Sequence, residues 1–263
     1  MEKGKTILYS EKLEIGYASK KGKNVIASGI SISLNAGKLI ALIGANGIGK
    51  STLLRTLTGI QKPLSGNVIL NGESISKFNS MELAQQLSIV LTENLPPSNL
   101  TVFELVALGR QPYTNWIGKL TSEDIAKVNE ALELTQISSL SAKKHYEISD
   151  GQLQKVLVAR ALAQDTPLII LDEPTTHLDL LHKVSLLKLL KKLALETNKA
   201  ILFSTHDLDL ALQLSDEMIV MNSQKAVQDS PENLIKDGIL NSLFEDENIT
   251  FDQEKAKFIF KNL

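Results

Sequence analysis

The chain has 263 residues, of which 43% are apolar and 22% are charged, and its net charge at neutral pH is −2. The apolar share is enough for a sizeable core. Nothing in the charge balance points to a general nucleic-acid binder, so we expect no nucleic acid among the partners. The absence of cysteine excludes disulfides and thiolate metal sites. No apolar run approaches the roughly 18 residues that a membrane-spanning helix needs, and the N-terminus lacks a signal-peptide pattern. We therefore expect any membrane contact to be made through a partner.

The first third of the chain reads as short strands around one helix. Strands are predicted over residues 6–17, 30–34, 38–44 and 66–72. The stretch 38–44 is continuously apolar, which is typical of a buried strand. A helix is predicted over residues 50–60 and ends near Gly59 and Pro63. The early strands predict an N-terminal antiparallel β part.

From about residue 83 to residue 164 the pattern becomes helical. Thr101 is the expected N-cap of one helix, and Thr121 with Asp124 resembles a capping box at the start of a second, amphipathic helix. A third helix is predicted over residues 150–164. This stretch predicts an inserted helical subdomain.

After residue 166, apolar strands alternate again with helices. Strands are predicted over residues 167–174, 199–207 and 217–222, and helices over residues 180–196 and 208–215. Such alternation predicts a mostly parallel sheet with helices on its faces, so the fold class is α/β. From about Asn222 the signal weakens, and we expect a small peripheral tail. The predicted parts are a core at residues 1–87 and 164–225, the helical subdomain at 88–163 and the tail at 226–263.

The segment GANGIGKST, residues 44–52, fits the pattern G-x-x-x-x-G-K-[ST] between a predicted strand and a predicted helix. Backbone N–H groups in such a loop converge on phosphate oxygens, and the helix N-terminus adds positive potential. Ser51 is placed to ligate Mg²⁺. The expected ligand is therefore a nucleoside triphosphate. We expect it to be bound by the exposed backbone, the lysine and the hydroxyls of one loop: Asn46, Gly47, Gly49, Lys50, Ser51 and Thr52.

Two acidic residues follow the predicted buried strand LIIL, at the sheet edge where α/β proteins bind ligands. We expect Asp172 to hold Mg²⁺ through water and Glu173 to polarise the attacking water, as the catalytic base. His206 follows another apolar strand at the same edge, where contact with the γ-phosphate is expected. A GTPase would carry N-K-x-D, but the one candidate, NKAI at 198–201, lacks the aspartate. A small-molecule kinase would not explain ISDGQ within the helical insert.

The segment ISDGQ, residues 148–152, resembles the LSGGQ signature of the ATP-binding subunits of ABC transporters. Other motifs follow the order of that family: THLD, with Asp179, resembles its D-loop, His206 matches the switch histidine, and Tyr17 matches the aromatic residue that stacks on adenine. The resemblance runs from about Ile7 to Met221. It implies a P-loop NTPase core and hydrolysis of ATP with Mg²⁺.

The resemblance also implies a homodimer with two copies packed head to tail. Each ATP would lie between the phosphate loop of one copy and the signature of the other. Ser149 and the backbone N–H of Gly151 would bind the γ-phosphate, with Gln152 beside them at the start of a helix. Asp179 would link the two sites across the interface.

Two positions depart from the family pattern. Asp150 stands where the family most often has glycine, and we expect its carboxylate to point away from the phosphate, toward its own helix N-terminus. The family also has a Q-loop, whose glutamine contacts Mg²⁺ and water. In this sequence no glutamine follows Gln86 in the stretch where the Q-loop is expected. Ungapped counting puts Thr92 at that glutamine's position with Glu93 beside it, and either side chain is a candidate Mg²⁺ ligand.

The segment LTVFELVALGRQPY, residues 100–113, resembles the subunits that energise importers of iron–siderophore, haem and vitamin B12. This implies permease partners, an extracytoplasmic binding protein as an indirect partner, and a peripheral location on the cytoplasmic face of the inner or plasma membrane. The alternative is a soluble ABC ATPase, such as one for iron–sulfur cluster assembly. A two-unit translation or repair ATPase is disfavoured, because the chain has one phosphate loop and one signature.

Overall fold

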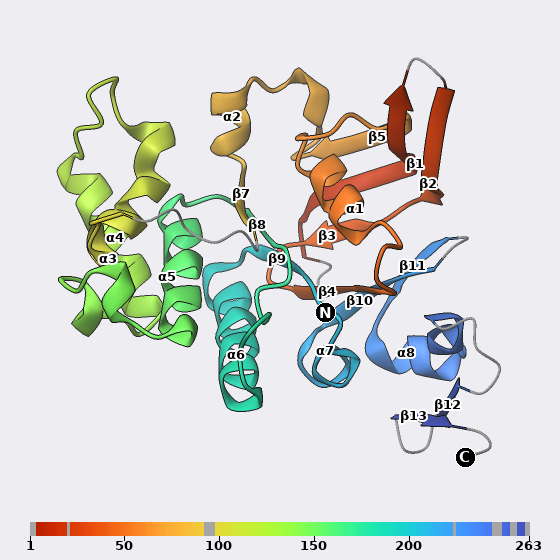
Figure 1. The fold of residues 1–263 in the computed structure, drawn as a ribbon. Coiled ribbons are helices and arrows are strands. Elements are labelled where there is room, and N and C mark those ends of the chain that lie inside the picture. Colours follow the sequence, from red (N-terminus) through yellow and green to blue (C-terminus); the bar gives the residue numbers. More distant parts are fainter. Residues whose placement is uncertain are drawn as a thin grey trace.

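The molecule has two principal β-sheets, one mostly parallel and one antiparallel (Figure 1). The structure is a computed structural model, and it describes residues 4–19, 22–91, 98–222, 225–243, 249–252 and 257–260. None of the helices in these ranges is long and apolar enough to cross a membrane.

The larger sheet has six strands and supplies the centre of the molecule. Its strands, in spatial order, are β11 (Ala226–Asp229), β10 (Glu217–Met221), β4 (Leu39–Gly44), β9 (Ala200–Ser204), β8 (Leu168–Leu171) and β7 (Leu87–Val90). All neighbours pair in parallel except β10 and β11. Strands β4, β8 and β9 are buried along their whole length, which explains their continuous apolar sequences. The predicted mostly parallel sheet is confirmed.

The second sheet is antiparallel and comes from the N-terminal part of the chain, as predicted. Its strands are β1 (Thr6–Ser19), β2 (Gly22–Ile30), β3 (Ser33–Asn35), β5 (Ser65–Leu70) and β6 (Glu73–Ser74). β1 is the hub of this sheet, because it pairs with β2, β3 and β5. The predicted strand over residues 30–34 is divided between the end of β2 and β3.

Alternation along β4 assigns the two sheet faces to two different cores. Leu39 and Ala41 pack with the helices, whereas Ile40 and Leu42 pack with the antiparallel sheet and the first helix. The helices are α1 (Lys50–Leu57), α2 (Ser80–Ala84), α3 (Val102–Ala107), α4 (Ser122–Leu134), α5 (Asp150–Ala163), α6 (Leu180–Thr197), α7 (Leu208–Leu214) and α8 (Pro231–Lys236). Short 3-10 turns lie at Ile75–Lys77, Leu108–Tyr113, Ser138–Leu140, His145–Glu147 and Ile239–Leu243.

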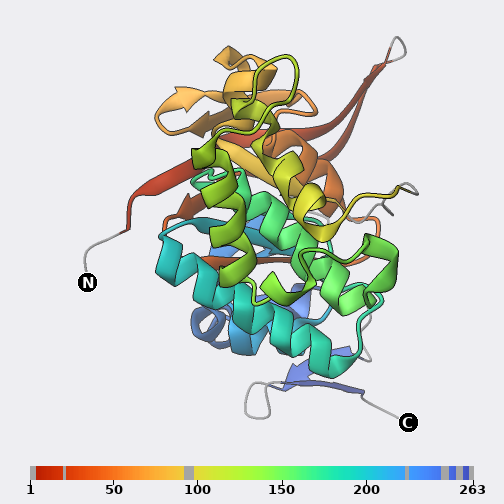
Figure 2. The same ribbon diagram turned by 90° about the vertical axis from the view of Figure 1, so that its left-hand side faces the viewer.

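The helical region with α3, α4 and α5 is inserted between β7 and β8, as predicted. In Figure 1 it lies to the left, opposite the strands β1, β2 and β5, and in Figure 2 it faces the viewer. Capping boxes begin its helices at Thr101, Thr121 and Ser149. A buried ion pair between Arg110 and Asp124, 2.8 Å from Nε to Oδ1, joins the turn after α3 to the start of α4.

The chain after β10 is integrated with the central sheet rather than separate from it. β11 pairs with β10, and side chains of α8 and the following turn, Leu234 and Leu240, are buried in the same core as the helices. A two-stranded sheet follows, β12 (Ile249–Asp252) with β13 (Lys257–Phe260). β7 spans the predicted boundary between residues 87 and 88, and the three-part division of the chain stays a prediction.

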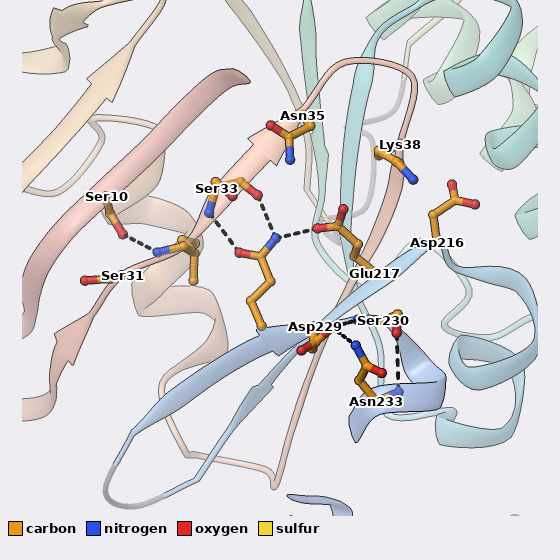
Figure 3. A pocket seen from close by; sticks show the side chains of 12 residues that line it. Ser10, Ser31, Ser33, Asn35, Lys38, Asp216, Glu217, Asp229, Ser230 and Asn233 are labelled. Atoms are coloured by element: carbon orange, nitrogen blue, oxygen red, sulfur yellow. Dashed lines mark hydrogen bonds between the residues drawn. The ribbon is translucent and has the colours of Figure 1, made fainter. Parts of the chain in front are cut away.

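The two principal sheets meet beside a polar hollow of about 670 Å³, shown in Figure 3. Gln228 of β11 bridges this seam. Its Oε1 accepts a hydrogen bond from Ser33 N at 2.8 Å, and its Nε2 donates to Ser33 O at 2.6 Å and to Glu217 Oε2 at 2.8 Å. One amide side chain thereby ties β3, β10 and β11 together.

Candidate nucleotide-binding site

The predicted phosphate loop lies between the end of β4 and the start of α1. Gly47 and Gly49 have φ values of 78° and 111°, which favour glycine. A Cβ at Gly49 would lie 2.5 Å from Ile26 Cγ2, whereas nothing lies within 4 Å of the position of a Cβ at Gly47. The loop is thus glycine-rich for two reasons: Gly49 packs against protein, and Gly47 keeps a left-handed turn on the exposed side.

The amino group of Lys50 is folded back onto this loop. Its Nζ donates to the carbonyl oxygens of Gly44 at 2.8 Å and Ala45 at 3.3 Å. Burial lowers the pKa of Lys50 below its usual range, while the carboxylates of Glu173 and Asp172 oppose that shift. A desolvated cation held against bare backbone is a strong attractor for phosphate oxygens.

Asp172 and Glu173 directly follow β8, and Ser204 at the end of the neighbouring β9 joins them. The Ser204 hydroxyl donates to Asp172 Oδ1 at 2.7 Å and accepts from Glu173 N at 2.8 Å. Glu173 has a φ of 46°, so its backbone turns sharply out of the strand. Thr176 Oγ1 also donates to Glu173 Oε2 at 3.2 Å. The two carboxylates are therefore oriented by hydroxyl groups, a feature that the sequence did not reveal.

Ser51 and Asp172, two of the predicted metal ligands, line one hollow of about 230 Å³. Ser51 stands at the start of α1 and Asp172 directly after β8, so the hydroxyl and the carboxylate come from different elements. Oxygen ligands of this kind suit a hard divalent cation that also keeps phosphate and water ligands. The other two candidates, Thr92 and Glu93, lie outside the described residues.

Tyr17 and His206 complete the group around the loop. The Tyr17 hydroxyl lies 3.4 Å from Thr52 Oγ1, and almost half of the tyrosine side chain is exposed. His206 Nδ1 lies 4.0 Å from Glu173 Oε2, and its side chain is half exposed. Asn46 is exposed at the tip of the loop. Residues from β1, the loop, β8 and the end of β9 therefore surround the same place.

The signature lies apart from this group in the same chain. In Figure 1, α5 stands within the helical region, away from α1. Ser149 Oγ accepts from Gln152 N at 3.3 Å, while Ser149 N donates to Gln152 Oε1 at 3.0 Å, so both side chains form the capping box of α5. Asp150 is exposed in the first turn, beside the positive end of its own helix. Asp179 caps α6 by accepting from His182 N at 2.9 Å.

Comparison with known proteins agrees with this arrangement. The family model described as "ABC transporter" matches residues 27–176. The chain is 41% identical to an uncharacterized ABC transporter ATP-binding protein, MJ0873, of Methanocaldococcus jannaschii, over 97% of this chain and 87% of that protein. It is 40% identical to the achromobactin transport ATP-binding protein CbrD of Dickeya dadantii, over 91% and 88% of the two chains. It is also 40% identical to the iron(3+)-hydroxamate import ATP-binding protein FhuC of Bacillus subtilis, over 84% and 81%.

Solved structures show the same fold. The ADP conformation of MJ1267, an ATP-binding cassette of an ABC transporter, has a TM-score of 0.78 at 26% identity and covers 90% of this chain and 96% of that one. The dimeric structure of MJ0796, a bacterial ABC transporter cassette, has a TM-score of 0.72 at 25% identity and covers 86% and 99%. The chain belongs to the ABC transporter family, as an ATP-binding subunit that hydrolyses ATP.

Proposed function

We propose that this ATPase powers a membrane importer of iron chelates, with siderophore-bound iron as the first candidate and haem or cobalamin as related ones. The names of its relatives support this proposal, because CbrD is named for achromobactin transport and FhuC for iron(3+)-hydroxamate import. The segment 100–113, which forms α3 and the turn after it, also supports it. Neither of these two relatives is named for the alternative, a soluble ABC ATPase.

The observation that carries the catalytic proposal is the hydroxyl-oriented pair of carboxylates beside the phosphate loop. Glu173 takes a proton from water as the water oxygen attacks the γ-phosphorus, and the bond from that phosphorus to the bridging oxygen of ADP breaks. The products are ADP and phosphate. Lys50 holds the outer phosphates, and His206, 4.0 Å from Glu173, contacts the γ-phosphate.

Mg²⁺ fits the pair of oxygen ligands at Ser51 and Asp172 on the shared hollow. When bound, Mg²⁺ neutralises charge that develops on the phosphate oxygens. The task of this chain is to orient its own ligands, and the Ser204 hydroxyl does so for Asp172.

In a single copy the signature does not lie beside the phosphate loop, and a homodimer can supply it from the second copy. The signature residues Ser149, Gly151 and Gln152 are at the start of α5, a helix that stands apart from α1 in Figure 1, and the related cassette MJ0796 is dimeric. We therefore propose that the signature of each copy binds the γ-phosphate held by the other, with Asp179 at the interface and Tyr17 against the adenine. Permease subunits then hold the pair at the cytoplasmic face of the membrane.

Glu173→Gln and Lys50→Ala test the catalytic proposal together. Glu173→Gln keeps size and hydrogen bonding but lacks the basic oxygen, so turnover falls by about 10²–10⁴-fold while ATP binding persists and an ATP-bound dimer accumulates. Lys50→Ala loses phosphate affinity and forms no such dimer. The measurements are ATP binding, hydrolysis and molecular mass for each variant. Near-normal hydrolysis by Glu173→Gln would show that another residue is the base.

The importer proposal needs a separate experiment. The tagged chain is purified from its native membrane, and the proteins that accompany it are identified. A polytopic membrane protein is the expected partner, and uptake of labelled iron chelates by cells with and without the chain then separates siderophore, haem and cobalamin. Recovery of the chain without any membrane protein, together with unchanged uptake of all three ligands, would favour the soluble alternative.

A further inference from the structure

The first turn of α6 carries two charged or polar side chains that the proposed mechanism does not use. They are His182 and Lys183, the third and fourth residues after the D-loop aspartate Asp179. Successive residues on an α-helix project about 100° apart, so neighbours in sequence reach different surroundings. Here His182 lies against the D-loop and the signature, and Lys183 pairs with the residue after the switch histidine.

His182 contacts both the D-loop and the signature. Its Nδ1 lies 2.8 Å from Asp179 Oδ1, which also accepts from His182 N at 2.9 Å. The imidazole occupies the space beside Gly151, because a Cβ built on that glycine would lie 2.7 Å from His182 Cδ2 and 3.3 Å from Cγ. The glycine of the signature therefore lies against a partly exposed imidazole that the D-loop aspartate holds by a hydrogen bond.

Lys183 contacts the switch loop. Its Nζ donates to Asp207 Oδ2 at 2.9 Å, and both side chains are largely buried, with 19% and 26% of their surfaces exposed. Asp207 occupies the N-cap position of α7, but its carboxylate makes no capping hydrogen bond and pairs with Lys183 instead. Asp207 directly follows His206, so this ion pair holds the backbone next to the switch histidine in place.

The rest of α6 is anchored in the core, so it can hold the residues of its first turn in place. Leu186, Leu190 and Leu193 are at most 2% exposed and anchor the helix in the main core. A rigid helix so anchored holds the contacts at its first turn in fixed relative positions. The contact with Gly151 bridges the core and the helical region, whereas the contact with Asp207 lies within the core.

We propose that the first turn of α6 is a junction that sets the relative positions of the signature, the D-loop and the switch loop within one chain, with His182 and Lys183 as positioning residues. The inference rests on the proposed function, since its consequence is for the closing of the ATP-bound dimer. Removing either contact should leave ATP binding to a single copy unchanged, because neither residue is part of the phosphate loop. It should raise the ATP concentration that is needed for dimer formation.

The test uses the full chain carrying Glu173→Gln, in which the ATP-bound dimer accumulates. His182→Asn removes the ring, and His182→Phe keeps a ring but removes the side-chain bond to Asp179, while the backbone bond remains. Lys183→Met keeps the apolar stem but removes the charge. We expect each to raise the ATP concentration for half-maximal dimerisation at least about 5-fold, the lower end of typical couplings between sites. Lys183→Arg should restore the reference value. ATP binding to the monomer, measured below the dimerisation range, should stay within about twofold.

The outcomes separate this inference from the proposed function. If Glu173→Gln alone forms no ATP-dependent dimer, the proposed function fails. If it dimerises but His182→Asn and Lys183→Met dimerise at the same ATP concentration, the junction is wrong. A lowered thermal unfolding midpoint without any shift in dimerisation would make the two residues merely structural and would also overturn the inference. If His182→Asn does not fold, His182→Phe alone decides the role of the bond to Asp179.

Discussion

The hydroxyl of Ser204, at the end of β9, donates a hydrogen bond of 2.7 Å to Oδ1 of Asp172, at the end of β8. Ser204 is fully buried, so this bond orients the carboxylate from inside the sheet. Groups that orient a metal ligand in this way typically change metal affinity or activity by about 10–100-fold when they are removed. The proposed Mg²⁺ site therefore depends on a residue that is not one of its ligands.

Ser204→Ala should raise the Mg²⁺ concentration for half-maximal ATP hydrolysis by about 10–100-fold. The measurement is a Mg²⁺ titration of hydrolysis at saturating ATP. Ser88→Ala is the matched control, because Ser88 is also buried in this sheet but its hydroxyl accepts from Thr166 rather than contacting the site. Equal Mg²⁺ dependence of the two variants would mean that Asp172 needs no support from Ser204.

Tyr17→Ala should weaken ATP binding by about 1–3 kcal/mol, the range for a base stacked on an aromatic ring, whereas Tyr17→Phe should bind like the unaltered chain. The phenylalanine variant removes only a hydroxyl that lies 3.4 Å from Thr52 Oγ1. Equilibrium titration with ATP measures the difference, with Tyr146→Ala, an exposed tyrosine of the helical region, as control. Unchanged affinity in Tyr17→Ala would place the adenine elsewhere.

Asp124 gives the helical region an acid-sensitive support. Hydrogen bonds from the backbone N–H and the hydroxyl of Thr121, together with the Arg110 guanidinium, hold the pKa of Asp124 below its usual range. A lowered pKa in the folded state stabilises the fold above the unfolded pKa of about 3.9, and that contribution is lost as the pH falls through the folded value.

Asp124→Asn should therefore cost about 3–5 kcal/mol at neutral pH, because it leaves a buried guanidinium without its partner. The free energy difference from the unaltered chain should stay constant between pH 8 and pH 5 and shrink below pH 4. Urea unfolding across this pH range measures it. Glu130→Gln, which removes an exposed ion pair with Lys127, should cost at most about 1 kcal/mol. A difference that grows on acidification would contradict the assignment.

Gln228→Glu should destabilise the fold more than Gln228→Ala. The alanine loses hydrogen bonds worth about 1 kcal/mol each. The glutamate, in addition, turns a carboxylate oxygen toward Ser33 O and Glu217 Oε2, where the amide now donates (Figure 3). Urea unfolding at pH 7 compares the two variants. Equal stability would show that the seam between the sheets tolerates a second negative charge.

Local patterns in the sequence predicted the strands β1, β4, β5, β8, β9 and β10, the cap of α3 and the capping box of α4, because each is set by residues a few positions apart. They also predicted the phosphate loop and the carboxylates after β8, which the structure brings together. They did not predict most of β2 or β7, which lies in the stretch that reads as helical. The bond between Ser204 and Asp172 and the packing of His182 against Gly151 could not be predicted. Each contact joins residues about 30 positions apart. No local sequence pattern around a serine or a histidine indicates which distant residue it will contact.

The same limit applies to the glycines and to the end of the chain. Bare backbone in the loop predicted close approach of phosphate, but Gly44 and Gly49 are also required by protein packing against Met221 and Ile26. The weak pattern after Asn222 predicted a peripheral tail, whereas β11 pairs with β10 in the central sheet. Short elements with few apolar residues give little periodicity, even when they complete a sheet.

The helical region leaves from β7 and returns to β8, and these neighbours form one edge of the central sheet. For the folding chain, their pairing closes a long loop, and the entropy cost of such closure grows by only about 0.6 kcal/mol for each doubling of loop length. Lengthening or shortening the turns among α3, α4 and α5 should thus have little effect on the stability of the sheet. The surface that α3 and α4 present can be remodelled over evolutionary time without loss of the central sheet, provided that the start of α5, which carries the signature, keeps its place.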